Sequence, residues 1–304
     1  MVVEEIDTIG ERVRNWGRWG AEDEVGTLNH ITAQHVRTAA ALIRRGRVFE
    51  LSIPLAADGP QDGVHRANPM HLMTELGDDQ QIPGGMRYAD DRIHMDLQAG
   101  TQWDALAHVH YRGQMYNGFS ADTLTVQGAA RNSIDKVPAG VTGRGVLLDM
   151  ARLAGVDWLP AGHVIEPEDL DAALGHQRVT VGQGDVVLVR TGWRRRFHEQ
   201  PDGWIAEAPG LGRRCAEWLH GRDVAALAAD NWAVDAHPGE DPGVLLPLHI
   251  LLIRDMGMTL GEMFDLEELA EDCAEDGRFE FFFTAPPLKI TGAVGSPISP
   301  IAIK

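Results

Sequence analysis

The chain has 304 residues and a formal net charge of −18, from 27 basic and 45 acidic side chains. A surface this acidic repels phosphate groups, so nucleic acids and anionic membranes are disfavoured as partners. Hydrophobic residues make up 44% of the chain and charged residues 24%, which is typical of a folded globular protein. The two cysteines, Cys215 and Cys273, form no CxxC motif, so neither a disulfide framework nor a thiolate zinc site is expected.

The first residues predict no export signal. Glu4 and Glu5 stand where a signal peptide would be basic, and no apolar segment follows them. The most apolar stretch, 244–253, is interrupted by Pro247 and His249 and is too short to cross a bilayer. We therefore expect a cytoplasmic protein. Because we find no repeat and no long linker, we also expect a single domain over residues 1–304.

The apolar spacing predicts the first elements in chain order. Residues 31–45 have the spacing of an amphipathic helix. Residues 48–55 resemble a strand that ends near Pro54. Residues 58–87 are rich in glycine, proline and polar side chains, and we expect them to form a loop or a lid over a pocket. Alternation over 92–98 predicts another strand.

Three later apolar runs are typical of buried central strands: residues 145–150, 185–191 and 224–229. Helical patterns over 166–174 and 211–220 lie between these runs. Strand and helix therefore alternate, which predicts the α/β class with extra strands near each end of the chain.

The segment RIHMDLQAGTQWDALAHVHYRG, which begins at Arg92, concentrates three histidines, two aspartates and two glutamines. On a strand, His94, Asp96 and Gln98 would share one face because side chains alternate. Carboxylates, imidazoles and amides at this density suit a divalent cation, and a histidine with a partner carboxylate equally suits a general base. A polar strand edge followed by a capped helix is the alternative without a functional role.

A second polar cluster follows the run that ends at residue 229. Asp230, Asp235 and His237 stand where open α/β sheets place ligand sites. His249 lies inside the apolar run VLLPLHILLI, and Glu262 follows it. A lone histidine in such a run is more often a core residue than a ligand.

The run GTQWDALAH, residues 100–108, resembles the signature H-x-G-T-H-x-D-x-x-x-H of the putative cyclase family, which includes kynurenine formamidases and isatin hydrolases. Other segments resemble further parts of that family in the same order: WGAEDEVGTLNHIT from Trp19, RGRVFELSIPL from Arg45, DVVLVRTGW from Asp185 and HILLIRDMGMTLGEMFDLEEL from His249. The resemblance implies a swivelling β/β/α fold with a central mixed sheet, in a homodimer or homotetramer. It also implies an amidohydrolase-like enzyme that cleaves an amide, lactam or lactone of a small substrate through a divalent-metal-activated water.

The resemblance also assigns roles to residues of this chain. The family's metal ligands fall on Gln98, Gln102, Asp104 and His249, and its catalytic pair falls on His108 and Glu262. We further expect Trp103, His110 and Asp230 to contact the substrate. His108 follows Asp104 by four residues, so the two would share a face if Asp104 opens a helix.

Glutamine at positions 98 and 102, where the family has histidine, sets this chain apart. A glutamine carbonyl oxygen binds Mn²⁺ or Mg²⁺ but is a weaker ligand than imidazole for Zn²⁺, so we expect manganese or magnesium over zinc. His94 and Asp96 are candidates to compensate in part. Two other hypotheses remain open: a metal-free cyclase or lyase that uses His108 and Glu262 as acid and base, and a non-catalytic binding protein on the same fold.

Overall fold

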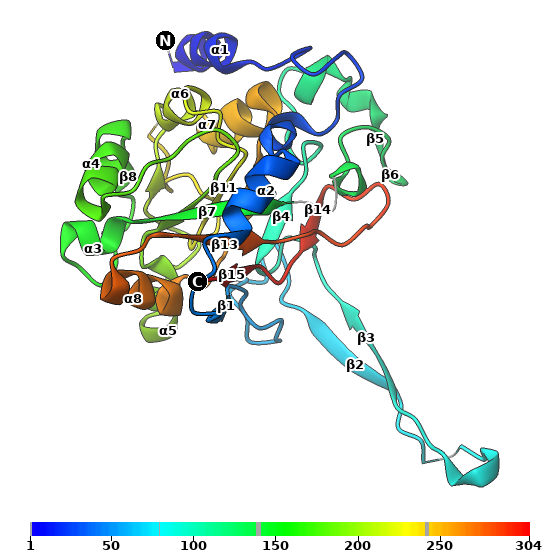
Figure 1. The fold of residues 1–304 in the computed structure, drawn as a ribbon. Coiled ribbons are helices and arrows are strands. Elements are labelled where there is room, and N and C mark those ends of the chain that lie inside the picture. Colours follow the sequence, from blue (N-terminus) through cyan, green and yellow to red (C-terminus); the bar gives the residue numbers. More distant parts are fainter. Residues whose placement is uncertain (1, 79, 138–140, 241–242) are drawn as a thin grey trace.

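The computed structural model describes residues 2–78, 80–137, 141–240 and 243–304. A curled, mixed sheet of nine strands forms its centre, in the order β1-β15-β13-β7-β9-β11-β12-β4-β14 (Figure 1). The four strands β7, β9, β11 and β12 are parallel to one another, and the strands on either side of them are antiparallel. This architecture confirms the α/β class and the central mixed sheet expected from the sequence.

The strands of the central sheet are β1 (Val48–Glu50), β4 (Gln102–Asp104), β7 (Thr142–Asp149), β9 (Val186–Arg190), β11 (Ala226–Ala229), β12 (Thr259–Glu262), β13 (Glu280–Thr284), β14 (Gly295–Pro297) and β15 (Ile301–Ile303). Three two-stranded sheets accompany it: β2 (Met70–Glu75) with β3 (Asp90–His94), β5 (Leu124–Thr125) with β6 (Gly128–Ala129), and β8 (Val164–Ile165) with β10 (Gly210–Leu211).

The α-helices are α1 (Val2–Val13), α2 (Ala33–Ala40), α3 (Met150–Ala154), α4 (Pro167–Gln177), α5 (Trp193–Glu199), α6 (Cys215–His220), α7 (Pro247–His249) and α8 (Glu267–Asp276). Short 3₁₀ turns occur at Gly26–His30, Pro83–Gly85, Tyr116–Gly118, Ala121–Thr123 and Ile134–Lys136, and Ile250–Met256 form a π-helix. Within the described ranges, the structure contains no helix long and apolar enough to cross a membrane.

The central strands are largely apolar because both faces of the sheet are covered. In β9, Val187 and Val189 pack into the core cluster shared with α4 and α6, whereas Val186 and Leu188 pack into the cluster shared with α8. All five residues of β9 are buried. The same alternation in β7 and β11 explains why the sequence shows continuous apolar runs there rather than a period of two. The three predicted central strands are thus confirmed.

Two predicted elements are shorter in the structure. The helix expected over 31–45 is confirmed only as α2, Ala33–Ala40, where Thr32 and His35 form a reciprocal capping box at its start. The strand expected over 48–55 ends at Glu50, because the antiparallel pairing of β1 with β15 covers three residues. Likewise the predicted 92–98 strand ends at His94.

The segment expected to be a loop or lid contains regular structure. Its first residues, 61–66, lie against the body of the protein, as shown below. From Met70 the chain leaves the body as β2, turns, and returns as β3, so that the two strands form a projecting hairpin (Figure 1). Every residue of both strands is exposed.

The pairing of β4 with β12 builds the polar centre of the molecule. Gln102 lies opposite Glu262, and Asp104 lies opposite Leu260, in an antiparallel ladder. Residues directly opposite each other in such a ladder place their side chains on the same face. Gln102, Asp104 and Glu262 therefore project together, while Trp103 between them projects from the other face.

Candidate metal centre and catalytic site

Asp104, His249 and Glu262 form one buried group. Each offers a ligand atom, and these atoms all lie within 4.8 Å of one another. Asp104 and Glu262 come from adjacent strands, and His249 comes from α7 at the start of the π-helix. Their exposed fractions are 0%, 3% and 3%, so bulk water does not screen their charges.

Asp104 is the most unusual member of the group. Among the residues that the structure describes, neither of its carboxylate oxygens has a hydrogen-bond partner, although both are buried. The Nε2 atom of His249 lies 3.8 Å from Oδ2, and the Nε2 atom of His108 lies 3.7 Å from Oδ1, both too long for hydrogen bonds. A buried carboxylate is costly unless it is paired, protonated or bound to a metal. Asp104 thus marks the position where a cation would be stabilised most.

Asp235 orients His249. Its Oδ2 atom accepts a hydrogen bond of 2.7 Å from Nδ1 of His249, and its Oδ1 atom accepts one of 2.8 Å from the backbone N–H of Leu248. With Nδ1 occupied, Nε2 of His249 faces Glu262 Oε1 at 3.2 Å and Asp104. A carboxylate behind the distal nitrogen is the usual arrangement for a metal-binding histidine.

The pKa values of the group report an excess of negative charge. Burial and repulsion from Glu262 raise the pKa of Asp104 well above its ordinary value. Burial opposes protonation of His249, but hydrogen bonds to Asp235 and Glu262 outweigh it and raise the pKa of His249 to about 10. Three carboxylates, Asp104, Glu262 and Asp235, therefore share one imidazole. This donor set fits a divalent cation in charge and in ligand chemistry.

Gln102 belongs to the same group, whereas Gln98 lies at its edge. The Gln102 amide donates a hydrogen bond of 2.5 Å to Glu262 Oε2, and its buried carbonyl oxygen has no hydrogen-bond partner within the described part of the chain. Gln98 packs against Gly295, which pairs with Asp104 across β14 and β4. Gln102 is thus placed to offer its carbonyl oxygen as a further ligand.

His108 reaches Asp104 by a turn and not by a helix. The helix considered from the four-residue spacing is absent, because Asp104 ends β4 and the His108 N–H bonds to the Ala105 carbonyl in a turn. The two side chains nevertheless approach to 3.7 Å, and 21% of the His108 side chain is exposed. Burial and the nearby His249 lower the pKa of His108 to about 4, so His108 is neutral at pH 7.

The three residues expected to contact a substrate lie apart from this group. Trp103 is fully buried on the other face of β4, where it packs against Phe264 and Phe283 and donates to the Ala285 carbonyl. Asp230 is buried and accepts three hydrogen bonds from Thr191 and Gly192, which fix the start of α5. His110 is exposed. We therefore do not carry these three residues into the proposed substrate site.

His94 and Asp96 do not compensate for the two glutamines. His94 is exposed at the end of β3, and Asp96 is exposed and accepts a hydrogen bond of 2.8 Å from Ala67 N–H. The alternation that suggested a shared face with Gln98 ends at His94, because β3 belongs to the projecting hairpin.

A partly open cavity of about 360 Å³ lies near the group. Gln61 and Arg66 line it. Their side chains donate hydrogen bonds to the backbone carbonyls of Ala99 and Gln98, respectively. The charge of Arg66 also acts on Asp104 and His108. The rest of the wall combines polar and apolar residues: Asp62, His65, Ile205, Ala206, Trp232, His237, Leu245 and Leu246. In the described structure, Trp232 Nε1 and His237 Nδ1 are buried without hydrogen-bond partners. The two rings pack edge to face, with their centroids 5.2 Å apart, and their residues form part of the cavity wall.

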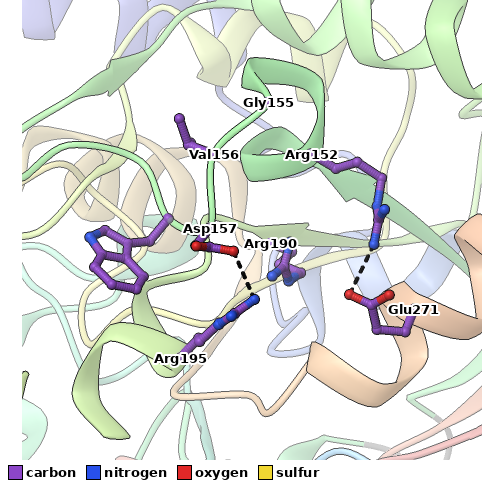
Figure 2. Close-up of a pocket in the computed structure, with 8 residues that line it drawn as sticks. Arg152, Gly155, Val156, Asp157, Arg190, Arg195 and Glu271 are labelled. Carbon is purple, nitrogen blue, oxygen red and sulfur yellow. Dashed lines mark hydrogen bonds and ion pairs between the residues drawn. The ribbon is translucent and has the colours of Figure 1, made fainter. Parts of the chain in front are cut away.

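A second pocket, of about 580 Å³, is larger but less suited to chemistry (Figure 2). Figure 2 shows Arg152 bound to Glu271 and Arg195 bound to Asp157, at 3.0 and 2.9 Å. The third arginine, Arg190, is buried between Asp149 and Glu267. Because each arginine already has an acidic partner, this pocket offers little unsatisfied charge for a ligand.

Comparison with known proteins identifies the family to which the chain belongs. The family model described as "Putative cyclase" matches residues 49–236, more than half of the chain and a range that includes Asp104, His108 and Asp235. The chain belongs to this family. The match ends before His249 and Glu262, so the structure, and not the family model, brings these two residues to Asp104.

Solved structures agree with this cyclase-family assignment. A crystal structure described as a novel cyclase is 40% identical, with a TM-score of 0.91, over 97% of this chain and 99% of that one. Isatin hydrolase A from Labrenzia aggregata, bound to benzyl benzoate, is 21% identical, with a TM-score of 0.64, over 87% and 94% of the two chains. A potential metal-dependent hydrolase with cyclase activity is 17% identical, with a TM-score of 0.56, over 84% and 98%. None of the curated proteins matches the chain in sequence. The family and these structures point to an enzyme.

Proposed function

We propose that this cyclase-family protein hydrolyses an amide, lactam or lactone bond of a small substrate with the help of one divalent cation. The observation that carries the proposal is the buried carboxylate of Asp104, whose two oxygens have no hydrogen-bond partner in the described structure while His249 and Glu262 stand within ligand distance. Buried carboxylates with strongly perturbed pKa values cluster at functional sites. The similarity to isatin hydrolase A and to a potential metal-dependent hydrolase supports the reaction class.

The cation would be held by Asp104, Glu262 and Nε2 of His249, with the Gln102 carbonyl oxygen as a further ligand. When bound, a divalent cation supplies Lewis acidity, which polarises a carbonyl group and makes water more acidic. Oxygen ligands outnumber nitrogen ligands here, which favours Mn²⁺ or Mg²⁺ over Zn²⁺. Asp235 holds the His249 ring so that its Nε2 lone pair faces the other ligands.

His108 is the residue placed to move a proton. Its imidazole is next to Asp104, partly open to solvent and neutral at pH 7, so one ring nitrogen has a free lone pair. We propose that this nitrogen takes a proton from the attacking water and returns it to the leaving nitrogen or oxygen of the substrate. General base catalysis of this kind contributes about 10²–10⁴ in rate.

The cavity beside the site supports a substrate with an apolar ring and one or more carbonyl groups. Leu245, Leu246 and Ile205 give apolar contact, and Trp232 adds an aromatic side chain to the wall. Arg66 stands between the cavity and the site, where it can pair with the carboxylate that amide or ester hydrolysis releases. A bicyclic lactam of modest size satisfies these requirements.

A metal-free proton-transfer enzyme is the second candidate. The observation that favours it is the contact between His249 Nε2 and Glu262 Oε1 at 3.2 Å. A proton shared between these two atoms would offset the negative charge of the group in place of a cation. In this alternative, Glu262 and His108 would act as acid and base in a cyclase or lyase reaction. Such an enzyme would keep its rate after treatment with a chelator, because no cation takes part in the reaction.

Turnover of a panel of lactams, lactones and linear amides tests the proposal. The protein is treated with EDTA, dialysed, and assayed with and without Mn²⁺, Mg²⁺ or Zn²⁺. We expect ring opening or amide cleavage that requires a divalent cation and is highest with Mn²⁺ or Mg²⁺. Full turnover in the EDTA-treated protein would favour the metal-free alternative, and no turnover of any panel member with any of the three metals would contradict the proposed reaction.

A further inference from the structure

Arg66 is a charged side chain of the cavity wall that has no acidic partner in the described structure. Its Nη1 atom donates a hydrogen bond of 3.3 Å to the Gln98 carbonyl, and it forms no ion pair with a described carboxylate. The arginines of the second pocket, in contrast, are each paired with an acidic residue. An arginine that lines a cavity without such a partner is available to bind an anion.

The carboxylate of Asp62 does not neutralise Arg66. Asp62 is the one acidic residue that the structure describes in the wall of the cavity. Its Oδ1 atom accepts hydrogen bonds from the backbone N–H groups of Val64 and His65, at 2.8 and 3.1 Å, and its Oδ2 atom lies 3.2 Å from Nδ1 of His65. Asp62 is therefore held by its own loop, which leaves the guanidinium of Arg66 unpaired.

The buried carboxylates of the candidate metal centre do not pair with Arg66 either. Arg66 attracts Asp104, but more weakly than His249 does. Asp104, Glu262 and Asp235 can carry three negative charges, and a divalent cation would offset two of them. The attraction between these carboxylates and Arg66 therefore becomes weaker still when the cation is bound.

Hydrogen bonds fix the loop that carries Arg66. The Gln61 N–H donates to Asn68 Oδ1 at 2.9 Å, and the Asn68 side-chain amide donates to the Gln61 carbonyl at 3.1 Å. The Gly63 N–H donates to the Arg66 carbonyl at 3.1 Å. Residues 61–68 are thereby closed into a compact loop. The position of the guanidinium is set before a ligand binds, which lowers the entropic cost of binding.

The guanidinium of Arg66 offers one complete edge to a ligand. Its Nη1 atom is occupied by the Gln98 carbonyl, whereas Nε and Nη2 make no hydrogen bond within the described part of the chain. The Nε–Nη2 edge of an arginine matches the two oxygens of a carboxylate, with which it forms two parallel hydrogen bonds. A neutral substrate that fills the cavity would instead remove water from this charged edge without replacing it, which costs free energy.

Resting on the proposed function, we propose that Arg66 selects substrates that carry a carboxylate in addition to the bond that is hydrolysed. This class comprises N-acyl amino acids, and lactams or lactones with a carboxylate substituent. The carboxylate would bind the Nε–Nη2 edge, and the apolar part of the substrate would contact Leu245 and Leu246. This role differs from pairing with the carboxylate that hydrolysis releases, because it acts before cleavage and favours one substrate over another.

Matched pairs of substrates test this selection. The members of a pair share the same amide, lactam or lactone bond and differ only in a carboxylate or a carboxamide substituent. We expect the wild-type kcat/KM to be about tenfold or more higher for the carboxylate member, mainly through a lower KM. Arg66→Gln should remove most of this preference, and Arg66→Lys, which keeps the charge but not the planar fork, should retain part of it.

Arg195→Gln is the matched control for the turnover measurements. Arg195 lines the second pocket and already pairs with Asp157, so its replacement should leave the full preference for the carboxylate member. A wild-type enzyme that shows no preference within the pairs, or an Arg66→Gln variant that keeps the full preference, would overturn the proposal.

Binding of a small carboxylate tests the same site without turnover. Benzoate and benzamide share a ring and differ in charge, and isothermal titration in buffer with Mg²⁺ measures their dissociation constants. We expect benzoate to bind the wild-type protein about tenfold or more tightly than Arg66→Gln, with equal benzamide affinity in the two proteins. Any contact between benzoate and the cation is common to both proteins and cancels in the comparison.

The binding measurement separates this inference from the proposed reaction. Equal benzoate affinity in the wild-type protein and Arg66→Gln would overturn the selection of a carboxylate, even if the protein hydrolyses neutral lactams. Benzoate binding that depends on Arg66, in a protein that cleaves no amide, lactam or lactone, would support carboxylate recognition and contradict the proposed hydrolysis.

Discussion

Asp235 holds Nδ1 of His249 at 2.7 Å, and this contact determines what the rest of the site can do. It leaves Nε2 of His249 facing Glu262 and Asp104, so that one nitrogen and several carboxylate oxygens converge on one buried point. Asp235 itself is buried, and the Leu248 N–H donates to it and fixes its carboxylate. The ring cannot turn without breaking its hydrogen bonds to Asp235 and Glu262.

Replacing Asp235 should weaken cation binding, although Asp235 is not itself one of the proposed cation ligands. We expect Asp235→Asn to raise the dissociation constant for Mn²⁺ by about 10–100-fold, because the histidine loses basicity and fixed orientation. Isothermal titration of the EDTA-treated protein measures it. Asp230→Asn is the control at an equally buried aspartate: it should lower the melting temperature, since Thr191 and Gly192 lose hydrogen bonds, but leave Mn²⁺ affinity unchanged. Equal Mn²⁺ affinity in Asp235→Asn and wild type would refute the orienting role.

Cation affinity should rise with pH. In the cation-free protein the pKa of His249 is raised to about 10, so His249 holds a proton near neutrality, and burial with the nearby Glu262 raises the pKa of Asp104, which makes this carboxylate easier to protonate. A cation must displace these protons, and low pH therefore favours the protonated, cation-free form. We expect the Mn²⁺ dissociation constant to fall by up to about tenfold per pH unit for each proton released, from roughly pH 6 to pH 9. A dissociation constant that does not change over this range would contradict the assignment.

The glutamine at position 102 should determine the choice of metal. With one imidazole and mostly oxygen ligands, the wild-type site should prefer Mn²⁺ or Mg²⁺, and Gln102→His should raise the affinity for Zn²⁺. Gln102→Asn, which keeps the amide but shortens the side chain, is the control and should gain no zinc affinity. Metal analysis of protein purified without added metal, followed by competition titrations, measures the preference. Stoichiometric zinc that resists EDTA in the wild-type protein would show that the ligand argument is wrong.

His108 should be needed for turnover and not for folding. We expect His108→Asn to lower kcat by about 10²–10⁴ while Mn²⁺ content and melting temperature stay near the wild-type values. The partly exposed position of His108 supports this separation of effects. His110→Asn is the matched control, because His110 is exposed and we place it outside the site. If His108→Asn melts several degrees lower and keeps most of its turnover, the histidine is structural and the proton must move through another group.

The buried strands could be predicted well because the apolar run that marks each of them spans only a few neighbouring residues. Residues 186–189 are a continuous apolar run because both faces of β9 are covered, and this is visible without knowing what covers them. The projecting hairpin of β2 and β3 could not be predicted in the same way. Residues 70–75 lack the sequence signs of a buried strand, because every residue of β2 is exposed in the hairpin.

The site was predicted in part, for a similar reason. The spacing of Asp104 and His108 placed them together, although through a turn in place of the considered helix. The distance between His249, Glu262 and Asp104 depends on the pairing of β12 with β4, which joins residues about 160 positions apart. For the same reason, Asp235 stood out in sequence only as one of several polar residues after β11, and its contact with His249 required the fold.

The binding of one Mn²⁺ per chain at Asp104 is the central claim. Titration of the EDTA-treated wild-type protein with Mn²⁺, followed by electron paramagnetic resonance of the free ion, measures it directly. Asp104→Asn keeps the shape of the side chain but removes its charge. We predict one equivalent bound by the wild-type protein and none by Asp104→Asn at the same concentrations, with matching circular dichroism spectra. One equivalent bound with equal affinity by both proteins, or none by either, would contradict the account.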